Sequence, residues 1–463
     1  MLNRKTYQEN FKKREKMKER VSADPFLLDL HVYPETGWLN DPNGLCYFDG
    51  LYHFYFQYSP LDAKRGDIIW GHVTSPDLIT YKREEPFIFA DSALDKDGAY
   101  SGSAFIKNGK INFFYTGNVK HEGDFDYITA GRDHNTIKIG SDGFTYNGKT
   151  LVMDHKDYPA DMTRHVRDPK IYEKDGAYYM FLGARSLSNK GMVLIFKSED
   201  LENFTYHMRV ETDFDFGYMW ECPDYFDLEG QGILVCCPQG VKSEEYRYQN
   251  IYQAGFFPLD LDLENKTYKL KDFVELDYGF DFYAPQTFEY PSGRRILIGW
   301  MGMPDADYTN PTEYDWQHAF TIPRVLSFEN GKLYQRPIEE YQKLRDRKIS
   351  LGKGTAYMGK VFEAVAENIR GDFSINIRED VTLTYENRIL TLDMGESSHG
   401  RKLRRIKLDQ VNKLEIFSDK SSLEIFVNNG EKVMTTRVYS EKYAFTSNDF
   451  DMKIHPLRPL TFK

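Results

Sequence analysis

Three short motifs each place a carboxylate in a setting that could support chemistry, and the first contains Asp41. It reads Trp38-Leu39-Asn40-Asp41-Pro42-Asn43-Gly44. Asn, Asp, Pro and Gly all favour turns, so a simple turn explains this stretch by itself. A residue before proline is also biased to an extended backbone, which would fix the direction of the Asp41 carboxylate. Asp41 is therefore a candidate reactive group as well as a turn residue.

The second motif, His165-Val166-Arg167-Asp168-Pro169, repeats the Asp-Pro pair. Arg167 and Asp168 could form an ordinary surface ion pair, which contributes little to stability. In a binding site, the cation would keep Asp168 ionised, and Arg167 could donate hydrogen bonds to sugar hydroxyls.

The third motif, Tyr218-Met219-Trp220-Glu221-Cys222-Pro223-Asp224, surrounds Glu221 with Met, Trp and Cys. A strand-edge glutamate that points to solvent is the simpler explanation. Burial near Trp220 would instead disfavour the charged form of the carboxyl, which is what a general acid needs.

Together the three motifs predict glycosidic bond cleavage. Two carboxylates suffice, because one can attack the anomeric carbon while the other protonates the leaving oxygen. A third that stays ionised can bind sugar hydroxyls and stabilise the positive charge of the transition state. The fold must bring all three to one place.

A series of apolar strands along the chain would provide that fold. Each follows a tight turn with glycine, and they recur roughly 60 residues apart, a spacing within reach of propeller repeats: 52–56, 111–115, 178–182, 233–235 and 296–298. Five such pulses predict an all-β fold with a five-bladed β-propeller over 25–336, whose blades would bring the motifs to a central channel. A jelly roll or a long sandwich is the competing interpretation.

The ends of the chain have different patterns. Residues 1–24 are rich in Lys, Arg and Glu and predict an N-terminal helical extension, with Tyr7, Phe11 and Met17 as packing residues. A helical linker is expected over 337–350. Residues 351–463 alternate polar and apolar side chains, for example at 422–427 before an Asn-Asn-Gly turn, and predict a β-sandwich.

Bulk properties exclude several classes of function. The net charge of −11 disfavours nucleic acid and anionic membranes as partners. The four cysteines form neither a disulfide framework nor a zinc pattern, and no secretory signal is apparent. We therefore expect a cytoplasmic enzyme with a small-molecule sugar substrate. No metal or organic cofactor is expected, because the carboxylates suffice for the chemistry. The oligomeric state is left open.

At these motifs the sequence closely resembles glycoside hydrolase family 32, the invertases, fructanases and sucrose-6-phosphate hydrolases. The resemblance runs from about Leu30 to the end of the chain and is carried by WLNDPNG (38–44), FYFQYSP (54–60), WGH (70–72), YSGSA (100–104), RDPK (167–170), WECPD (220–224), DFYAPQT (281–287) and GWMG (299–302). It implies a five-bladed propeller followed by a β-sandwich, in agreement with the strand pattern.

The resemblance also implies roles. Asp41 is expected to be the nucleophile, Glu221 the acid/base and Asp168 the transition-state stabiliser. The fructose pocket is expected to be shaped by Asn40, Gln57, Trp70, Ser101, Arg167 and Trp300, with core packing as the alternative for the two tryptophans. Tyr283 lies in a matched motif but receives no role.

One departure concerns the rim of the pocket. Arg65 stands where some secreted invertases carry a tryptophan, so a stacking contact is lost and positive charge is added. Lys64 and Arg65 are candidates to bind a phosphate on the glucose unit, with Arg132 and His134 as weaker ones, although a solvated Lys-Arg pair is the commoner explanation.

The main hypothesis is hydrolysis of the terminal β-fructosyl bond of sucrose 6-phosphate or sucrose by a retaining double displacement. Exo-hydrolysis of short fructo-oligosaccharides and transfructosylation are the alternatives within this class. A catalytically inert carbohydrate-binding protein is the alternative outside it, and the presence of Asp41 and Glu221 argues against that.

Overall fold

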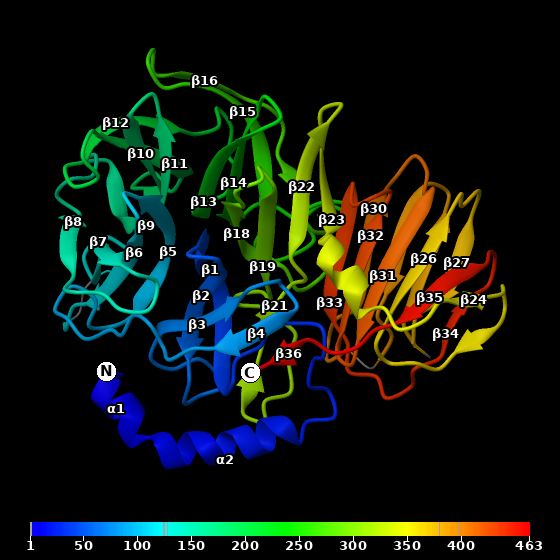
Figure 1. The fold of residues 1–463 in the computed structure, drawn as a ribbon. Helices are drawn as coiled ribbons and strands as arrows, with labels where there is room; N and C mark the ends of the chain where they lie inside the picture. The colour runs from blue at the N-terminus through cyan, green and yellow to red at the C-terminus, as the bar shows by residue number, and fades with distance from the viewer. Residues whose placement is uncertain (1, 124–125, 127, 379, 397) are drawn as a thin grey trace.

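The computed structural model describes residues 2–123, 126, 128–378, 380–396 and 398–463. Figure 1 shows a strand-rich molecule in which blades from about the first three quarters of the chain stand beside a layered sandwich formed by the last quarter. The predicted propeller followed by a β-sandwich is confirmed. In the described part of the chain, no helix is both long and apolar enough to cross a bilayer.

Five antiparallel sheets make the blades, and each has its first strand innermost. The first blade contains β1 (Gly37–Phe48), β2 (Leu51–Ser59), β3 (Ile69–Ser75) and β4 (Thr80–Arg83), with β20 (Trp316–Gln317) added in parallel to β1. The second contains β5 (Ala99–Lys107), β6 (Lys110–Lys120), β7 (Arg132–Ser141) and β8 (Thr150–Met153). The third contains β9 (Met162–Lys174), β10 (Ala177–Ser186), β11 (Gly191–Ser198) and β12 (Thr205–Val210).

The fourth blade contains β13 (Met219–Leu228), β14 (Gln231–Gln239), β15 (Gly255–Asp262), β16 (Thr267–Leu270) and β17 (Val274–Glu275). The fifth contains β18 (Tyr283–Glu289), β19 (Arg295–Met301), β21 (Ala319–Phe320), β22 (Arg324–Glu329) and β23 (Lys332–Pro337).

The predicted apolar strands are the second strands of these blades. They are buried on both faces, as their composition requires. In the turn that precedes β2, both Asp49 and Gly50 have positive φ, the backbone of a two-residue hairpin turn that matches the strand twist. Asn108-Gly109 and Asp175-Gly176 repeat that conformation.

The inner strand of every blade carries a β-bulge next to a site motif. In β1 the pairing register shifts between Leu39 and Pro42, and in β13 it shifts between Glu221 and Asp224. The register also shifts in β5, β9 and β18. A bulge bends a strand and redirects its side chains, so the same device at five places turns polar groups towards the central axis.

Two six-stranded sheets form the sandwich. One contains β24 (Ile349–Leu351), β35 (Met452–Pro456), β26 (Phe362–Glu367), β31 (Lys413–Asp419), β32 (Ser422–Val427) and β33 (Lys432–Arg437). The other contains β25 (Ala356–Tyr357), β34 (Phe445–Ser447), β27 (Phe373–Asn376), β28 (Thr382–Glu386), β29 (Ile389–Asp393) and β30 (Leu403–Lys407). Their apolar side chains form one continuous core.

The last strand returns to the propeller. β36 (Thr461–Phe462) pairs in parallel with β4, so the end of the range predicted as sandwich lies on the first blade. This return depends on a long-range pairing that no local pattern reveals.

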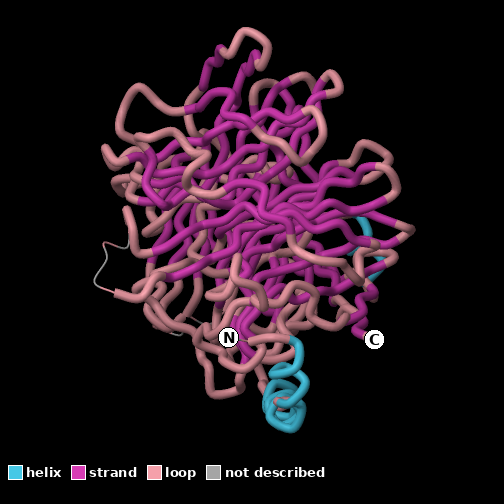
Figure 2. The backbone as a smooth tube through the Cα atoms, turned by 90° about the vertical axis from the view of Figure 1, so that its left-hand side faces the viewer, coloured by secondary structure: helices cyan, strands magenta, loops and turns pink. Residues whose placement is uncertain are grey.

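Helices are few and peripheral, as Figure 2 shows. Among the described residues they are α1 (Arg4–Glu9), α2 (Phe11–Ser22) and the 3₁₀ helix Glu339–Leu344 that lies between the two domains in the chain. Tyr7 and Met17 are buried as predicted, but Phe11 is exposed.

Buried ionic groups join the propeller to the sandwich. The His31 imidazole contacts the carboxylates of Asp419 (2.9 Å) and Glu424 (3.1 Å) through its two ring nitrogens. Arg324 bonds to Glu424 (2.7 Å) and Asp277 (3.2 Å), also fully buried. Because breaking a buried pair leaves an uncompensated charge, these contacts resist separation of the domains.

Candidate active site

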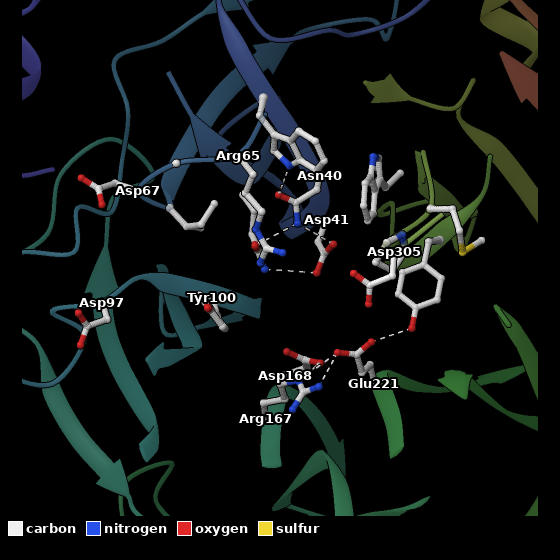
Figure 3. A pocket seen from close by; sticks show the side chains of 18 of the residues that line it. Asn40, Asp41, Arg65, Asp67, Asp97, Tyr100, Arg167, Asp168, Glu221 and Asp305 are labelled. Carbon is white, nitrogen blue, oxygen red and sulfur yellow. Dashed lines mark hydrogen bonds and ion pairs between the residues drawn. The ribbon is translucent and has the colours of Figure 1, made fainter. Parts of the chain in front are cut away.

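A cavity of about 920 Å³ opens at the propeller axis, and all three predicted carboxylates line it. Asp41 comes from β1, Asp168 from β9 and Glu221 from β13, and Figure 3 shows them directed into one space. Asp168 has φ +64° and its neighbour Cys222 has φ +50°, so bulged and locally strained backbone holds these groups.

The inner end of the cavity is narrow. A second hollow of only about 10 Å³ shares Asp168 with the cavity and is lined by Pro42, Pro169, Pro223 and Pro285. These prolines belong to the inner strands of four blades. The cavity therefore adjoins a proline-lined hollow that leaves little space beyond the carboxylates.

Asp41 is held by a set of donors. Its Oδ2 accepts from the Ser101 hydroxyl at 2.5 Å and from Gln57 Nε2 at 3.3 Å. Its Oδ1 accepts from Asn40 Nδ2 at 2.9 Å. Burial raises the pKa of Asp41, and the hydrogen bonds from Ser101 and Asn40 oppose that rise. The carboxylate thus has a fixed direction.

Glu221 lies among polar groups. Its Oε1 accepts from Arg167 Nη2 at 2.6 Å and Nε at 3.1 Å, while Oε2 accepts from Gln239 and from the Tyr283 hydroxyl, both at 2.7 Å. The expectation of apolar surroundings from Trp220 is wrong. That ring points into the core of the third and fourth blades, because neighbouring residues of a strand face opposite sides.

Asp168 completes the cluster. Its Oδ2 accepts from the backbone N–H of Cys222 at 2.9 Å and lies 4.0 Å from Arg167 Nε. Burial raises the pKa of Asp168, Arg167 opposes the rise and Glu221 adds to it. The cluster has three carboxylates and only one guanidinium, so the repulsion between negative charges favours keeping one carboxyl group protonated.

Cys222 connects the carboxylates. Its Sγ lies 3.6 Å from Asp168 Oδ2 and 3.9 Å from Asp41 Oδ2. The contact to Cys237, burial and the neighbouring carboxylates all raise the pKa of the Cys222 thiol. The sulfur is therefore a neutral thiol between two acidic groups rather than a nucleophile.

The remaining predicted residues are placed in two layers. Asn40, Gln57, Arg167 and Trp300 line the cavity. Ser101 supports Asp41 from behind, since it is 4% exposed.

The prediction that Trp70 shapes the sugar pocket is wrong. Its side chain is fully buried among Tyr55, Phe113 and Tyr115. Its indole N–H donates to the backbone carbonyl of Tyr100, so Trp70 supports the cavity lining indirectly, through Tyr100.

Sequence reasoning assigned no function to several groups that form the site. Trp38 lines the cavity next to Trp300 and donates to Asn40 Oδ1. Tyr283 and Gln239 hold Glu221. Trp38 and Tyr283 lie inside quoted motifs and could have been inferred, whereas Gln239 is only the cross-strand partner of Met219 and has no local signal.

Cations gather at the outer part of the cavity. Lys64, Arg65 and Arg132 all line it, and Figure 3 shows the Arg65 side chain reaching inward. Burial lowers the pKa of Arg132 to about 10, so this guanidinium stays charged at neutral pH. The prediction that His134 could help to bind a phosphate is wrong. This residue is buried, burial lowers its pKa well below the usual value, and its Nε2 accepts from Arg132 Nη1 at 3.1 Å. A neutral acceptor cannot serve as an anion-binding cation.

The arrangement supports acid/base and nucleophilic chemistry by carboxylates. Among the residues that the structure describes, no three His, Cys, Asp or Glu side chains are grouped as a metal site requires.

Comparison with known proteins agrees with the geometry. Residues 31–337 match the glycosyl hydrolases family 32 N-terminal domain, and residues 346–456 match the glycosyl hydrolases family 32 C-terminal domain. The chain is 41% identical to the sucrose-6-phosphate hydrolase of Staphylococcus xylosus over 93% of its length and 90% of that protein. It is 37% identical to the Bacillus subtilis sucrose-6-phosphate hydrolase over 95% and 93% of the two chains.

Solved structures give the same result. The sucrose-6-phosphate hydrolase of Lactobacillus gasseri superposes with a TM-score of 0.88 at 28% identity, covering 97% of this chain and 96% of that one. A Bombyx mori family 32 β-fructofuranosidase variant in complex with sucrose also has a TM-score of 0.88, at 27% identity, covering 99% and 100%. The chain belongs to glycoside hydrolase family 32 and is a glycoside hydrolase.

Proposed function

We propose that this enzyme releases the terminal β-D-fructosyl unit of sucrose-type sugars by a retaining double displacement. Asp41 is the nucleophile, Glu221 the acid/base and Asp168 the group that binds fructose hydroxyls and stabilises the transition state. The observation that carries the proposal is the convergence of these three carboxylates, from three blades, at the closed end of one cavity.

The chemistry needs two steps. An Asp41 oxygen attacks the anomeric carbon while Glu221 gives its proton to the glycosidic oxygen, which leaves as the glucose hydroxyl. Glu221 then takes a proton from water, which displaces Asp41 and releases fructose. The donors on Glu221 hold it in position for both transfers.

The inner cavity suits a fructose ring. Asn40, Gln57 and Arg167 offer hydrogen-bonding groups, while Trp38 and Trp300 supply flat apolar surface. Because the hollow behind the carboxylates holds only about 10 Å³, a sugar chain has little room to continue past them, which favours a fructosyl unit at the end of a chain. This supports exo-cleavage.

We infer that the preferred substrate is sucrose 6-phosphate. The net charge of −11 opposes an anionic ligand, so local cations must attract it. The pKa of Arg132 is lowered by burial and, in smaller part, by the charges of Arg167 and Arg65, and a phosphate between Arg65 and Arg132 would relieve the repulsion between these two guanidiniums. The similar proteins of Staphylococcus xylosus and Bacillus subtilis carry the name of that activity.

The phosphate assignment is tested by kcat/KM on both sugars with Arg65→Ala and Arg132→Gln. A charge-assisted Arg–phosphate contact contributes about 1.5–3 kcal/mol, so each change should cost roughly ten- to a hundredfold on sucrose 6-phosphate. Sucrose hydrolysis should hardly change. Arg388→Ala, on the exposed surface of the sandwich, is the matched control. Equal losses on the two sugars would contradict a phosphate site.

The catalytic roles are tested separately with Asp41→Asn and Glu221→Gln. Each removes one chemical role without a change of volume, so turnover should nearly vanish while the melting temperature stays within a few degrees. Near-normal turnover in either folded variant would overturn the assignment.

We propose that the enzyme acts in the cytoplasm. All four cysteines are free thiols, and Cys222 and Cys237 contact each other without being bridged, as a reducing compartment favours.

A further inference from the structure

A half-buried histidine stands directly behind the site arginine. His165 Nδ1 lies 2.9 Å from Arg167 Nη1. A guanidinium can only donate hydrogen bonds, so this ring nitrogen must be the acceptor and carries no proton. His165 is thus the neutral imidazole with its proton on Nε2.

The charges around His165 keep it neutral. The groups that act on it are Arg167 of its own strand, Arg132 of β7 and Arg185 of β10, all cations. The His134 ring meets it edge to face at 5.7 Å and is itself neutral. Burial and these cations lower the pKa of His165 far below its usual range, so the acceptor persists at working pH.

This contact engages the second terminal nitrogen of the Arg167 guanidinium. Nε and Nη2 both donate to Glu221 Oε1, and Nη1 donates to His165. Glu221 fixes one edge of the plane and His165 fixes the other. Alternate residues of a strand share a face, so the order His-Val-Arg in β9 places the imidazole beside the guanidinium.

The neighbouring blade repeats the device. On β7, Arg132 and His134 are also two residues apart, and His134 Nε2 accepts from Arg132. Two neutral imidazoles in contact therefore hold two cavity arginines, each through one nitrogen.

We propose that His165 is a positioning residue for hydrolysis, which orients Arg167 and through it Glu221. The inference rests on the proposed role of Glu221. His165 belongs to the layer behind the described lining of the cavity, so it acts through Arg167 rather than on the sugar.

The test compares His165→Leu with His165→Asn. Asparagine restores an acceptor near the position of Nδ1, whereas leucine removes it. His165→Leu should lower kcat for sucrose roughly ten- to a hundredfold with KM within about twofold, because a misplaced group costs rate more than binding. His165→Asn should keep kcat within about threefold of the wild type.

The pH profile gives a second readout. A loosened Arg167 stabilises the Glu221 carboxylate less, so the alkaline limb of kcat/KM should move to higher pH in His165→Leu and stay in place in His165→Asn. His207→Leu is the control, since His207 belongs to the same blade but bonds to the Leu263 carbonyl, away from the site. His165→Phe replaces the leucine variant if that one does not fold.

Two results would overturn the inference: a leucine variant with wild-type kcat and pH profile, or an asparagine variant as impaired as leucine. Glu221→Gln, measured beside them, separates the causes. An active Glu221→Gln enzyme refutes the proposed function itself, whereas an inactive one beside a normal His165→Leu enzyme refutes only the role of His165.

Discussion

Replacing Glu221 with glutamine should make the enzyme sensitive to its leaving group. Glutamine fits the same space, and its amide oxygen can still accept from Arg167, so only the contacts to Gln239 and Tyr283 are weakened. We expect the melting temperature to fall by a few degrees. General acid catalysis contributes roughly 10²–10⁴ in rate, or about 3–5 kcal/mol, and sucrose hydrolysis should slow by that factor.

The assay uses p-nitrophenyl β-D-fructofuranoside, whose leaving group needs no proton. Attack by Asp41 should remain fast in Glu221→Gln, giving a burst of nitrophenol equal to the enzyme concentration. The burst should be followed by slow turnover, because the base that activates water is missing. Azide needs no base and should restore turnover. Asp41→Asn should show no burst. A burst in Asp41→Asn, or none in Glu221→Gln, would refute the assignment of the two carboxylates.

The other predictions concern stereochemistry and pH. Proton NMR of the first fructose released should show retained configuration, since we expect Asp41 and Glu221 to be only about 5 Å apart; an inverted product would exclude a nucleophilic Asp41. Burial raises the pKa of Asp168 to about 7, from an unfolded value near 3.9. Between these two pH values the unfolded chain loses the Asp168 proton more readily than the folded protein, so the free energy of unfolding falls as pH rises. Asp168→Asn should therefore gain more in melting temperature over the wild type at pH 8 than at pH 4, and an equal gain at both would contradict this. Each ring nitrogen of His31 contacts a carboxylate, so both nitrogens must carry a proton. Burial alone would lower the pKa of His31, but Asp419 and Glu424 stabilise the charged imidazolium and raise it. Its contribution is complete below about pH 6.5 and is lost as pH rises through its folded pKa, so His31→Gln should cost about 3 kcal/mol at pH 6 and clearly less at pH 9, measured by denaturant unfolding.

Local signals were enough for the blades. The turns at Asp49-Gly50 and Asn108-Gly109 need only residues that tolerate positive φ, and the strands after them need only short apolar runs. These properties belong to a few neighbouring residues, so they can be read without knowing the fold. The motifs with Asp41, Asp168 and Glu221 are equally local.

The surroundings of each group depended on the fold. Glu221 is held by Tyr283 and Gln239, which are 62 and 18 residues away, so its polar setting was not visible beside Trp220 and Cys222. Trp70 faces the core and not the sugar, because the twist and pairing of β3 decide which side its ring occupies.

The sequence by itself determined the strand-and-turn repeat, the order of the domains and the three carboxylates that line one cavity. Only the tertiary structure decided that Arg167 lies between Glu221 and His165, that His134 is a neutral acceptor, and that His31 links domains across 388 residues. The physical reason is that backbone conformation is governed by nearby residues, whereas burial, ion pairing and proton positions depend on contacts between segments that only the closed propeller brings together.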